Sequence, residues 1–156
     1  MILNWYGRRY PSIEDLESAA WDLGAVVVYG AIPTAFCCMH PEGPIIGLPE
    51  SIGPLETAWL LAHEVGHLAK HCGYISEWTF SRQEHGAEAW AACALIPEVA
   101  VQRYKNASVD AFIGALSKHY EDIPLVNCRS REVAGIIARI RLSMVEDRQD
   151  NKEEAV

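Results

Sequence analysis

Apolar residues recur about every three to four positions in five segments of the chain, which is the spacing that places them on one face of a helix. The second segment is the most regular, with small and large apolar residues repeating over nearly five turns. We therefore predict five helices. They cover residues 12–24, 54–70, 81–96, 109–120 and 129–145.

Residues that start and stop helices bound these segments. Ser12 can cap the first helix, and Gly24 ends it. Ser81 and Glu84 have the spacing of a capping box, so the third helix is predicted to start at Ser81, and Pro97 stops it.

Three short apolar segments lie between the first two helices. Residues 25–29 are rich in valine and predict a buried strand. Residues 35–39 and 45–48 predict two more strands, and glycine- and proline-containing turns separate all three. Short strands joined by tight turns predict a small, mainly antiparallel sheet.

The segments follow one another without a repeat, a low-complexity linker or a second domain. The length of 156 residues suits one hydrophobic core. We predict a single domain over residues 1–145 and a charged, disordered tail over residues 146–156.

The chain is acidic, with 13 Lys and Arg against 21 Asp and Glu and a net charge of −8. Such a chain repels a phosphate backbone, and the basic pairs Arg8-Arg9 and Arg129/Arg131 are too short to count as a basic cluster, so direct nucleic-acid binding is not expected. No apolar run approaches the ~18 residues of a membrane span, and the N-terminus lacks the pattern of a secretory signal. These features predict a cytoplasmic protein without a membrane partner.

The five cysteines also agree with a cytoplasmic protein. Their number is odd, two are adjacent, and none forms a C-x-x-C pair, which is unlike a disulfide framework. We interpret them as reduced thiols. Cys72 lies near several histidines and could be a metal ligand, but a packed cysteine is the preferred interpretation.

One motif in the second helix carries chemistry. His63-Glu64-Val65-Gly66-His67 is an H-E-x-x-H sequence. Residues four apart lie on one helix face, ~6 Å apart along the axis, so His63 and His67 can bind one zinc ion. Zinc lowers the pKa of a bound water towards ~7, and Glu64 is placed to take its proton as the water attacks a peptide carbonyl. The alternative is a core-facing helix with two coincidental histidines.

A catalytic zinc site needs a third protein ligand. A metzincin would have a histidine at position 73, which is Gly73, and His71 lies ~12 Å along the axis from His63, too far to share one ion. Glu84 and Glu88 remain as candidates, because they lie four apart on the next predicted helix. Either could bind zinc while the other supports a ligand histidine, or both could be ordinary helix carboxylates.

The two helices together resemble the ImmA/IrrE family of zinc metallopeptidases. That family pairs an H-E-[apolar]-G-H helix with a helix of the form E-x-x-A-[N/D]-x-[F/W]-A-x-x-x-L-[IM]-P, and here residues 84–97 read EHGAEAWAACALIP. The resemblance implies that Glu84 is the third zinc ligand and that Glu88, at the Asn/Asp position, lies behind the ligands. The chain departs from many members at Gly86 and Glu88, so the choice between the two glutamates stays open. The likeness is strongest over residues 55–97.

The resemblance also implies a function. Family members associated with phages and mobile elements cleave a helix-turn-helix repressor. We therefore expect an α+β domain in which a small sheet packs on a zinc-binding helix pair, with additional C-terminal helices, and which acts as a zinc endopeptidase on such a repressor. An extended substrate segment could add to the sheet edge, for which residues 45–48 are the candidate strand.

Two questions stay open at this point. Tyr74, His85 and Tyr120 are equal candidates for stabilising the oxyanion. The rival function is a non-catalytic regulator that contains zinc and binds a repressor or antitoxin-like partner, although a structural zinc site would not need Glu64.

Overall fold

The structure is a computed structural model, and it describes residues 3–71, 80–103, 108–121 and 128–153. The elements are, in order, α1 (Ile13–Asp22), β1 (Val26–Gly30), β2 (Phe36–His40), β3 (Gly43–Pro49), α2 (Pro54–His71), α3 (Phe80–Leu95), α4 (Glu98–Arg103), α5 (Val109–His119) and α6 (Cys128–Glu153). This is an α+β fold, as the sequence predicts.

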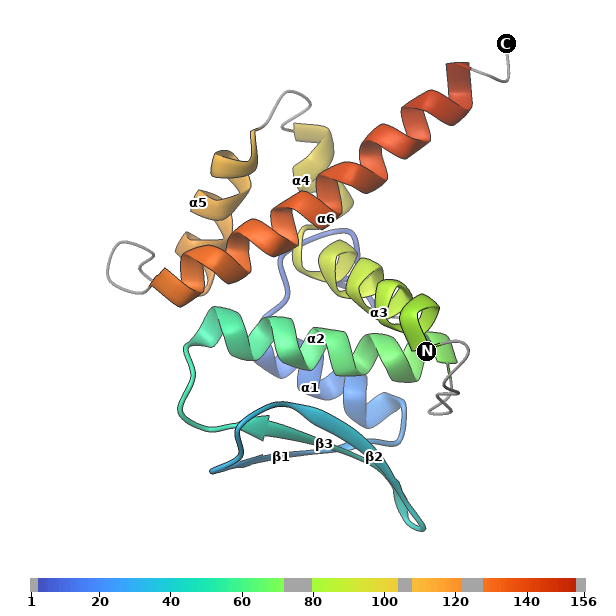
Figure 1. Ribbon diagram of the computed structural model, residues 1–156, viewed down its shortest axis with the longest axis vertical. Coiled ribbons are helices and arrows are strands. Elements are labelled where there is room, and N and C mark those ends of the chain that lie inside the picture. Colours follow the sequence, from blue (N-terminus) through green and yellow to red (C-terminus); the bar gives the residue numbers. More distant parts are fainter. Residues whose placement is uncertain (1–2, 72–79, 104–107, 122–127, 154–156) are drawn as a thin grey trace.

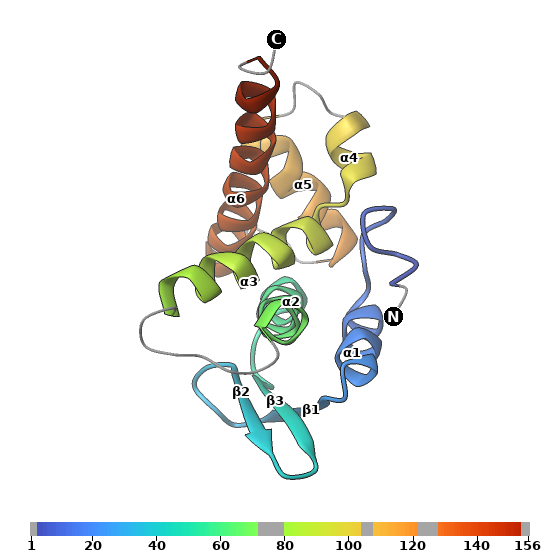
Figure 2. The same cartoon turned by 90° about the vertical axis from the view of Figure 1, so that its right-hand side faces the viewer.

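The elements form layers around α2. The sheet lies at one end of the molecule, α1 and α2 cover one of its faces, and the remaining helices lie on the far side of α2 (Figure 1). Viewed along its axis, α2 lies between the sheet, α1 and α3 (Figure 2). The helix that carries the H-E-x-x-H motif is therefore the central element of the fold.

The sheet is mixed, in the order β1-β3-β2. β2 and β3 form an antiparallel hairpin that turns at Gly43, where φ is +129°. β1, however, runs parallel to β3, with Val26 opposite Ile45. The prediction of a mainly antiparallel sheet is thus wrong for half of its pairings, because turn residues show where the chain reverses but not which strand it then pairs with.

The order of the strands corrects two further predictions. Residues 45–48 belong to β3, which is the central strand and so cannot be an edge for strand addition; the edges are β1 and β2. β1 is also not fully buried, since Val26 and Val28 are 48% and 44% exposed, although Val27 between them packs on the core. The helices cover only one face of the sheet, and the alternating side chains of β1 point to both faces.

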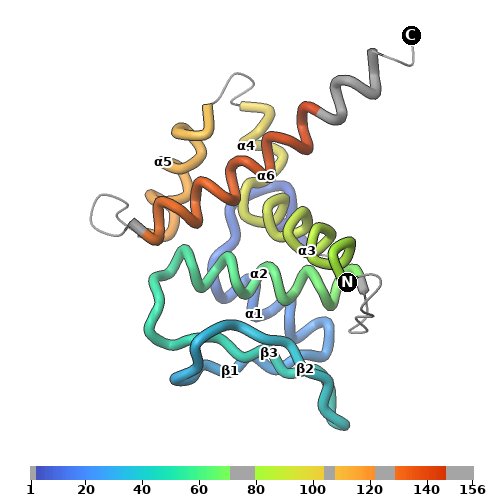
Figure 3. The backbone as a smooth tube through the Cα atoms, viewed as in Figure 1, coloured from blue at the N-terminus to red at the C-terminus, as the bar shows by residue number. Residues whose placement is uncertain are grey.

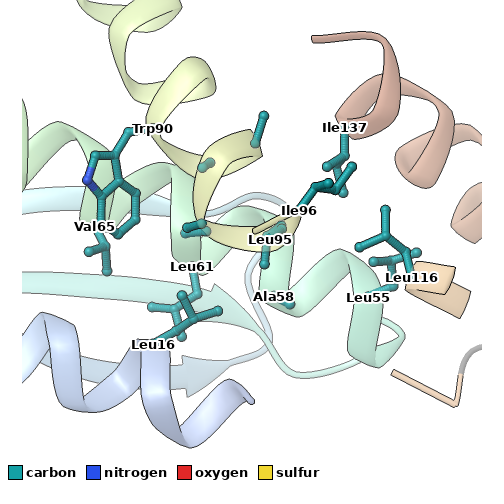
Figure 4. Packing of buried hydrophobic residues seen from close by; sticks show 14 of the residues in the cluster. Leu16, Leu55, Ala58, Leu61, Val65, Trp90, Leu95, Ile96, Leu116 and Ile137 are labelled. Carbon is teal, nitrogen blue, oxygen red and sulfur yellow. The ribbon is translucent and has the colours of Figure 1, made fainter. Parts of the chain in front are cut away.

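The core lies on both sides of α2 (Figure 4). Leu61 and Val65 of α2 are fully buried, as are Leu16 of α1 and Leu95 of α3. Burying a leucine side chain contributes ~1.5–3 kcal/mol, so these contacts hold the layers together.

The start of α1 is fixed by a complete capping box. The Ser12 hydroxyl accepts from the amide of Asp15, and the Asp15 carboxylate accepts from the amide of Ser12. Arg9 adds two hydrogen bonds to the same carboxylate, at 2.6 and 2.7 Å. The helix ends at Asp22, and Gly24 follows two residues later with a φ of +82° that suits a glycine.

The C-terminal half contains one helix that the sequence analysis missed and one that it made too short. α4 follows Pro97 and has only six residues, too few to show a period. α6 continues to Glu153, whereas the sequence predicted a disordered tail from residue 146. Charged residues, which suggested a tail, are equally compatible with an exposed helix.

A buried arginine joins α6 to the end of α3. Arg141 is 2% exposed, and its Nε donates to the carbonyl of Ile96 at 2.9 Å. Its Nη2 donates to the Glu98 carboxylate at 2.7 Å. The chain therefore turns from α3 into α4 at a fixed corner.

Candidate metal centre

His63 and His67 lie one turn apart on α2, on the side that faces α3. Their Nε2 atoms are 3.1 Å apart, and their rings meet edge to face with centroids 4.7 Å apart. His67 is buried, with 6% exposure, and His63 is half-buried. The helical spacing thus places two imidazole nitrogens at one point, as predicted from the motif.

Gly66 lets α3 approach this part of α2. A Cβ atom at Gly66 would lie 2.8 Å from the carbonyl oxygen of Ala87 and 3.1 Å from its Cα, closer than real Cβ atoms come to backbone. The second half of α2 and the middle of α3 consequently lie close together where the two helices cross (Figure 3).

This close approach brings Glu84 of α3 to both histidines. Its Oε2 lies 3.2 Å from His63 Nε2, and its Oε1 lies 3.0 Å from His67 Nε2. His63, His67 and Glu84 form a group that could hold a metal ion, with ligand atoms within 4.8 Å of one another. Glu88 is not part of this group.

Ser81 and Glu84 do not form the capping box that the sequence predicts for α3. The helix begins at Phe80, so Ser81 already lies within it. The carboxylate of Glu84 lies against the histidine rings instead of the start of the helix. A capping-box pattern and a ligand glutamate look the same in sequence.

The three side chains fit a tetrahedral zinc ion in chemistry and in size. Two imidazoles and one carboxylate are a common donor set for catalytic zinc. Bonds of ~2.0–2.1 Å at tetrahedral angles put ligand atoms about 3.3 Å apart. The two imidazole nitrogens are 3.1 Å apart, and they lie 3.0 and 3.2 Å from two different oxygens of the Glu84 carboxylate. Closing the site around an ion would need only small shifts.

Glu64 is a second carboxylate in the same cleft and is not a member of the metal-binding group. It is buried, with 9% exposure. Burial, together with the negative charge of Glu84, raises the pKa of Glu64 to about 7. A buried carboxylate with such a pKa can accept and release a proton near neutrality.

The site opens into a cleft of about 450 Å³ between α2, α3 and strand β2. Phe36, Cys37 and Met39 of β2 form its apolar wall. Met39 and Phe36 are 60% and 42% exposed. Local sequence pattern does not indicate that β2 lines the cleft, because strand order decides which strand faces the motif.

Cys37 is a thiol in this wall. Burial, and to a lesser degree the charge of Glu64, raises the pKa of Cys37 to about 11. It is free, as are Cys38 and Cys93, which agrees with the prediction of unpaired thiols. Cys37 does not belong to the metal-binding group.

The candidates for oxyanion stabilisation fall in three different places. Tyr120 is buried beside α1, where its hydroxyl donates to the carbonyl of Pro11, so it is excluded. His85 is exposed, its Nδ1 lies 2.7 Å from the carbonyl oxygen of Ser81, and it does not line the cleft. Tyr74 lies outside the described residues, as do Cys72 and Gly73.

Comparison of the chain with protein-family models, with curated proteins and with solved structures finds no match. In the described part of the chain, none of the helices has the length and apolar character needed to cross a membrane.

Proposed function

We propose that the chain is a zinc-dependent endopeptidase in which His63, His67 and Glu84 hold the metal and Glu64 is the general base. The three-residue group supports a metal site of the catalytic type, because three protein ligands leave one position open. The open cleft beside the group supports access for a substrate.

The observation that carries the proposal is the buried Glu64. Burying a carboxylate without a cationic partner costs stability, and a structural metal site has no need of one. Glu64 nevertheless lies in the cleft beside the three candidate ligands. A proton acceptor beside an open metal position is what peptide hydrolysis requires.

The reaction divides between the metal and the protein as follows. When bound, zinc supplies Lewis acidity that lowers the pKa of water towards ~7 and polarises a carbonyl. The Glu64 carboxylate takes a proton from the attacking water as the oxygen of that water bonds to the peptide carbon. The same group, now protonated, gives the proton to the leaving nitrogen as the C–N bond breaks. The products are a carboxylate and an amine.

Strand β2 supports binding of an extended substrate. It pairs with β3 on one side only, and the described residues place no strand on its other side. A substrate segment that adds to this edge would run along the cleft. The exposed side chains of Met39 and Phe36 favour an apolar substrate residue there. We thus propose β2 as the edge that binds the substrate, in place of the strand over residues 45–48 that the sequence suggested.

We further propose that the substrate is a helix-turn-helix repressor, on the basis of the resemblance of residues 55–97 to ImmA/IrrE peptidases. An extended segment of such a repressor would fit the open cleft better than a folded domain would. The protease would then act on its partner by irreversible cleavage.

The test compares wild type with Glu64→Gln at equal zinc loading. The substitution keeps the size of the side chain but removes the base, so cleavage of a repressor encoded beside this gene should slow by ~10²–10⁴-fold. Zinc content and the circular dichroism spectrum should not change. The matched control is Glu50→Gln, which neutralises an exposed glutamate outside both the cleft and the metal-binding group.

The same pair of proteins tests the rival function. A non-catalytic regulator would relieve repression in cells equally well with Glu64→Gln, because binding does not need a base. Full derepression by this variant would contradict the enzymatic proposal even if zinc is present. Protein that contains no zinc when purified without added metal would contradict both proposals.

A further inference from the structure

A second cavity, of about 650 Å³, lies among the N-terminal segment, α4 and α5. These helices lie on the far side of α2 from the sheet (Figure 1). The cavity shares no lining residue with the metal cleft. Its volume is within the range of ~300–1,000 Å³ typical of small-molecule sites.

The cavity is basic although the chain has a net charge of −8. Four of the 13 Lys and Arg residues line it, and no described Asp or Glu does. Arg9 is held by Asp15. The other three form no ion pair with a described residue. They are Arg8, Arg103 and Lys118.

Two acidic side chains beside lining residues of the cavity are already paired with arginines. Asp15 accepts two hydrogen bonds from Arg9, and Glu98, at the start of α4, accepts one from the buried Arg141. Apart from Arg9, the positive charges of the cavity therefore form no ion pair with a described residue. Arginine side chains in a concave site bind phosphate and carboxylate groups well, because their planar donors match these anions.

The rest of the lining is apolar and aromatic. Pro97, Ala100 and Ala115 contribute to it, and the rings of Tyr10 and His119 lie together with centroids 5.3 Å apart. A purely electrostatic patch for a bare ion would not need such a surface. A flat ring, by contrast, could pack against it.

Hydrogen bonds hold the three parts of the wall in place. The carbonyl of Pro11 accepts from the Tyr120 hydroxyl at 2.8 Å and lies 2.9 Å from His119 Nε2. The amide of Val99 donates to the carbonyl of Gly7 at 3.2 Å. The N-terminal segment is thereby fixed to α5 and to α4, so the cavity is a built feature of the fold.

We propose that this cavity binds a small phosphorylated ligand that carries a flat ring, of the nucleotide class. Arg8, Arg103 and Lys118 would contact the phosphates, and the ring would lie on the Tyr10–His119 side. The proposal does not depend on the metal site or on peptidase activity.

The probe is adenosine diphosphate, with pyrophosphate and adenosine as its two halves, titrated calorimetrically into the full chain. We expect saturable binding in which the diphosphate binds at least about tenfold more tightly than either half. Arg8→Gln/Arg103→Gln should weaken binding by about 100-fold, since each charged hydrogen bond contributes about a factor of ten or more. The affinity should also fall as salt is added.

Two controls separate a specific site from general charge. Arg131→Gln/Arg139→Gln changes two exposed arginines of α6 that do not line the cavity, and it should alter affinity by less than about twofold. His67→Ala removes a candidate metal ligand and should leave binding unchanged. An equal loss of affinity in the α6 variant would overturn the proposal, because the anion would then bind through overall charge. A loss of affinity in His67→Ala would also overturn it, because the anion would then bind at the metal centre.

Three other results would also overturn it. They are the absence of saturable binding, equal affinities for adenosine diphosphate and pyrophosphate, and a duplex DNA that binds more tightly through the same two arginines. Pyrophosphate at equal affinity would show that the ring contributes nothing. Tighter DNA binding would identify a macromolecular anion as the ligand. The circular dichroism spectrum of each variant confirms that a loss of binding is not a loss of fold.

Discussion

The Glu84 carboxylate lies against two imidazole rings on a neighbouring helix, and each of its oxygens faces one ring. Glu88, one turn later on the same helix, does not join them. Sequence alone left these two residues as alternatives, because both lie on one helix face. The tertiary contact between α2 and α3 distinguishes them, since it brings the Glu84 carboxylate to both histidine rings.

We therefore expect Glu84→Gln to weaken zinc binding far more than Glu88→Gln does. Loss of one ligand of three removes a charged donor, whereas loss of a residue behind the ligands costs only ~10–100-fold in affinity. Competition with a chromogenic chelator measures both affinities. If Glu88→Gln empties the site while Glu84→Gln keeps zinc, the assignment of the third ligand is wrong.

Asp15 offers a test that concerns stability alone. The hydrogen bonds from Arg9, aided by the amide of Ser12, hold the pKa of Asp15 below its usual value, although partial burial opposes them. Its contribution to stability is thus present above the unfolded pKa of ~3.9 and is lost as the pH falls through the lower, folded value. Asp15→Asn should cost about 1 kcal/mol at pH 7 and close to nothing once the pH is below the folded pKa.

Urea unfolding at several pH values measures this difference. Asp22→Asn, at the exposed C-terminal end of the same helix, is the matched control and should be neutral or slightly stabilising, because an acidic residue there opposes the helix dipole. A cost for Asp15→Asn that does not change with pH would show that its charge is not the cause.

At the scale of elements, the contact between α2 and α3 depends on Gly66. A methyl group there would meet the backbone of Ala87, which cannot rotate away as a flexible side chain would. Gly66→Ala should therefore destabilise the fold by ~1–3 kcal/mol and also weaken zinc binding, because α3 carries Glu84 away from the histidines. Denaturant unfolding and chelator competition measure the two effects.

Gly114→Ala provides the matched control. Gly114 lies in α5, and a methyl group there would meet nothing within 4 Å. The higher helix propensity of alanine should then stabilise the protein by ~0.5–1 kcal/mol without changing zinc affinity. Similar effects of the two substitutions would contradict a specific role for Gly66.

At the scale of the whole molecule, much of the fold could be predicted from local pattern. Periodic segments predicted α1, α2 and α5 to within two residues at each end, and the H-E-x-x-H spacing placed His63 and His67 on one helix face. These features depend on residues close together in the chain. The α+β class follows from them, because helices and strands occupy separate stretches.

The rest depends on long-range arrangement, which local pattern does not contain. The parallel pairing of β1 with β3 changed which strands are edges, and so which strand lines the cleft. Likewise, the pair Arg8-Arg9 looked too short to matter until the fold placed it beside Arg103 and Lys118. Each cluster combines residues from separate segments whose meeting only the tertiary structure shows.

Metal binding should stabilise the whole molecule, because its candidate ligands come from two helices of one core. At zinc concentrations ~1,000 times Kd, the gain is ~4 kcal/mol, which corresponds to a rise in Tm of about 8–16 °C for a chain of this size. Differential scanning calorimetry with and without zinc measures it. His63→Ala and His67→Ala should show little or no rise, and a full rise in both would place the metal elsewhere.

The central position of α2 has one more consequence. Because α2 packs against α1, α3, α6 and β3, we expect its backbone amides to be poorly exposed by local openings. Those amides should exchange with deuterium only when the entire chain unfolds, and their protection should equal the global free energy of unfolding. Amides of β1, at the outer edge of the sheet, should exchange through small local openings instead. If α2 exchanges slowly and β1 exchanges quickly, deuterium uptake would report the order in which the layers of the fold separate.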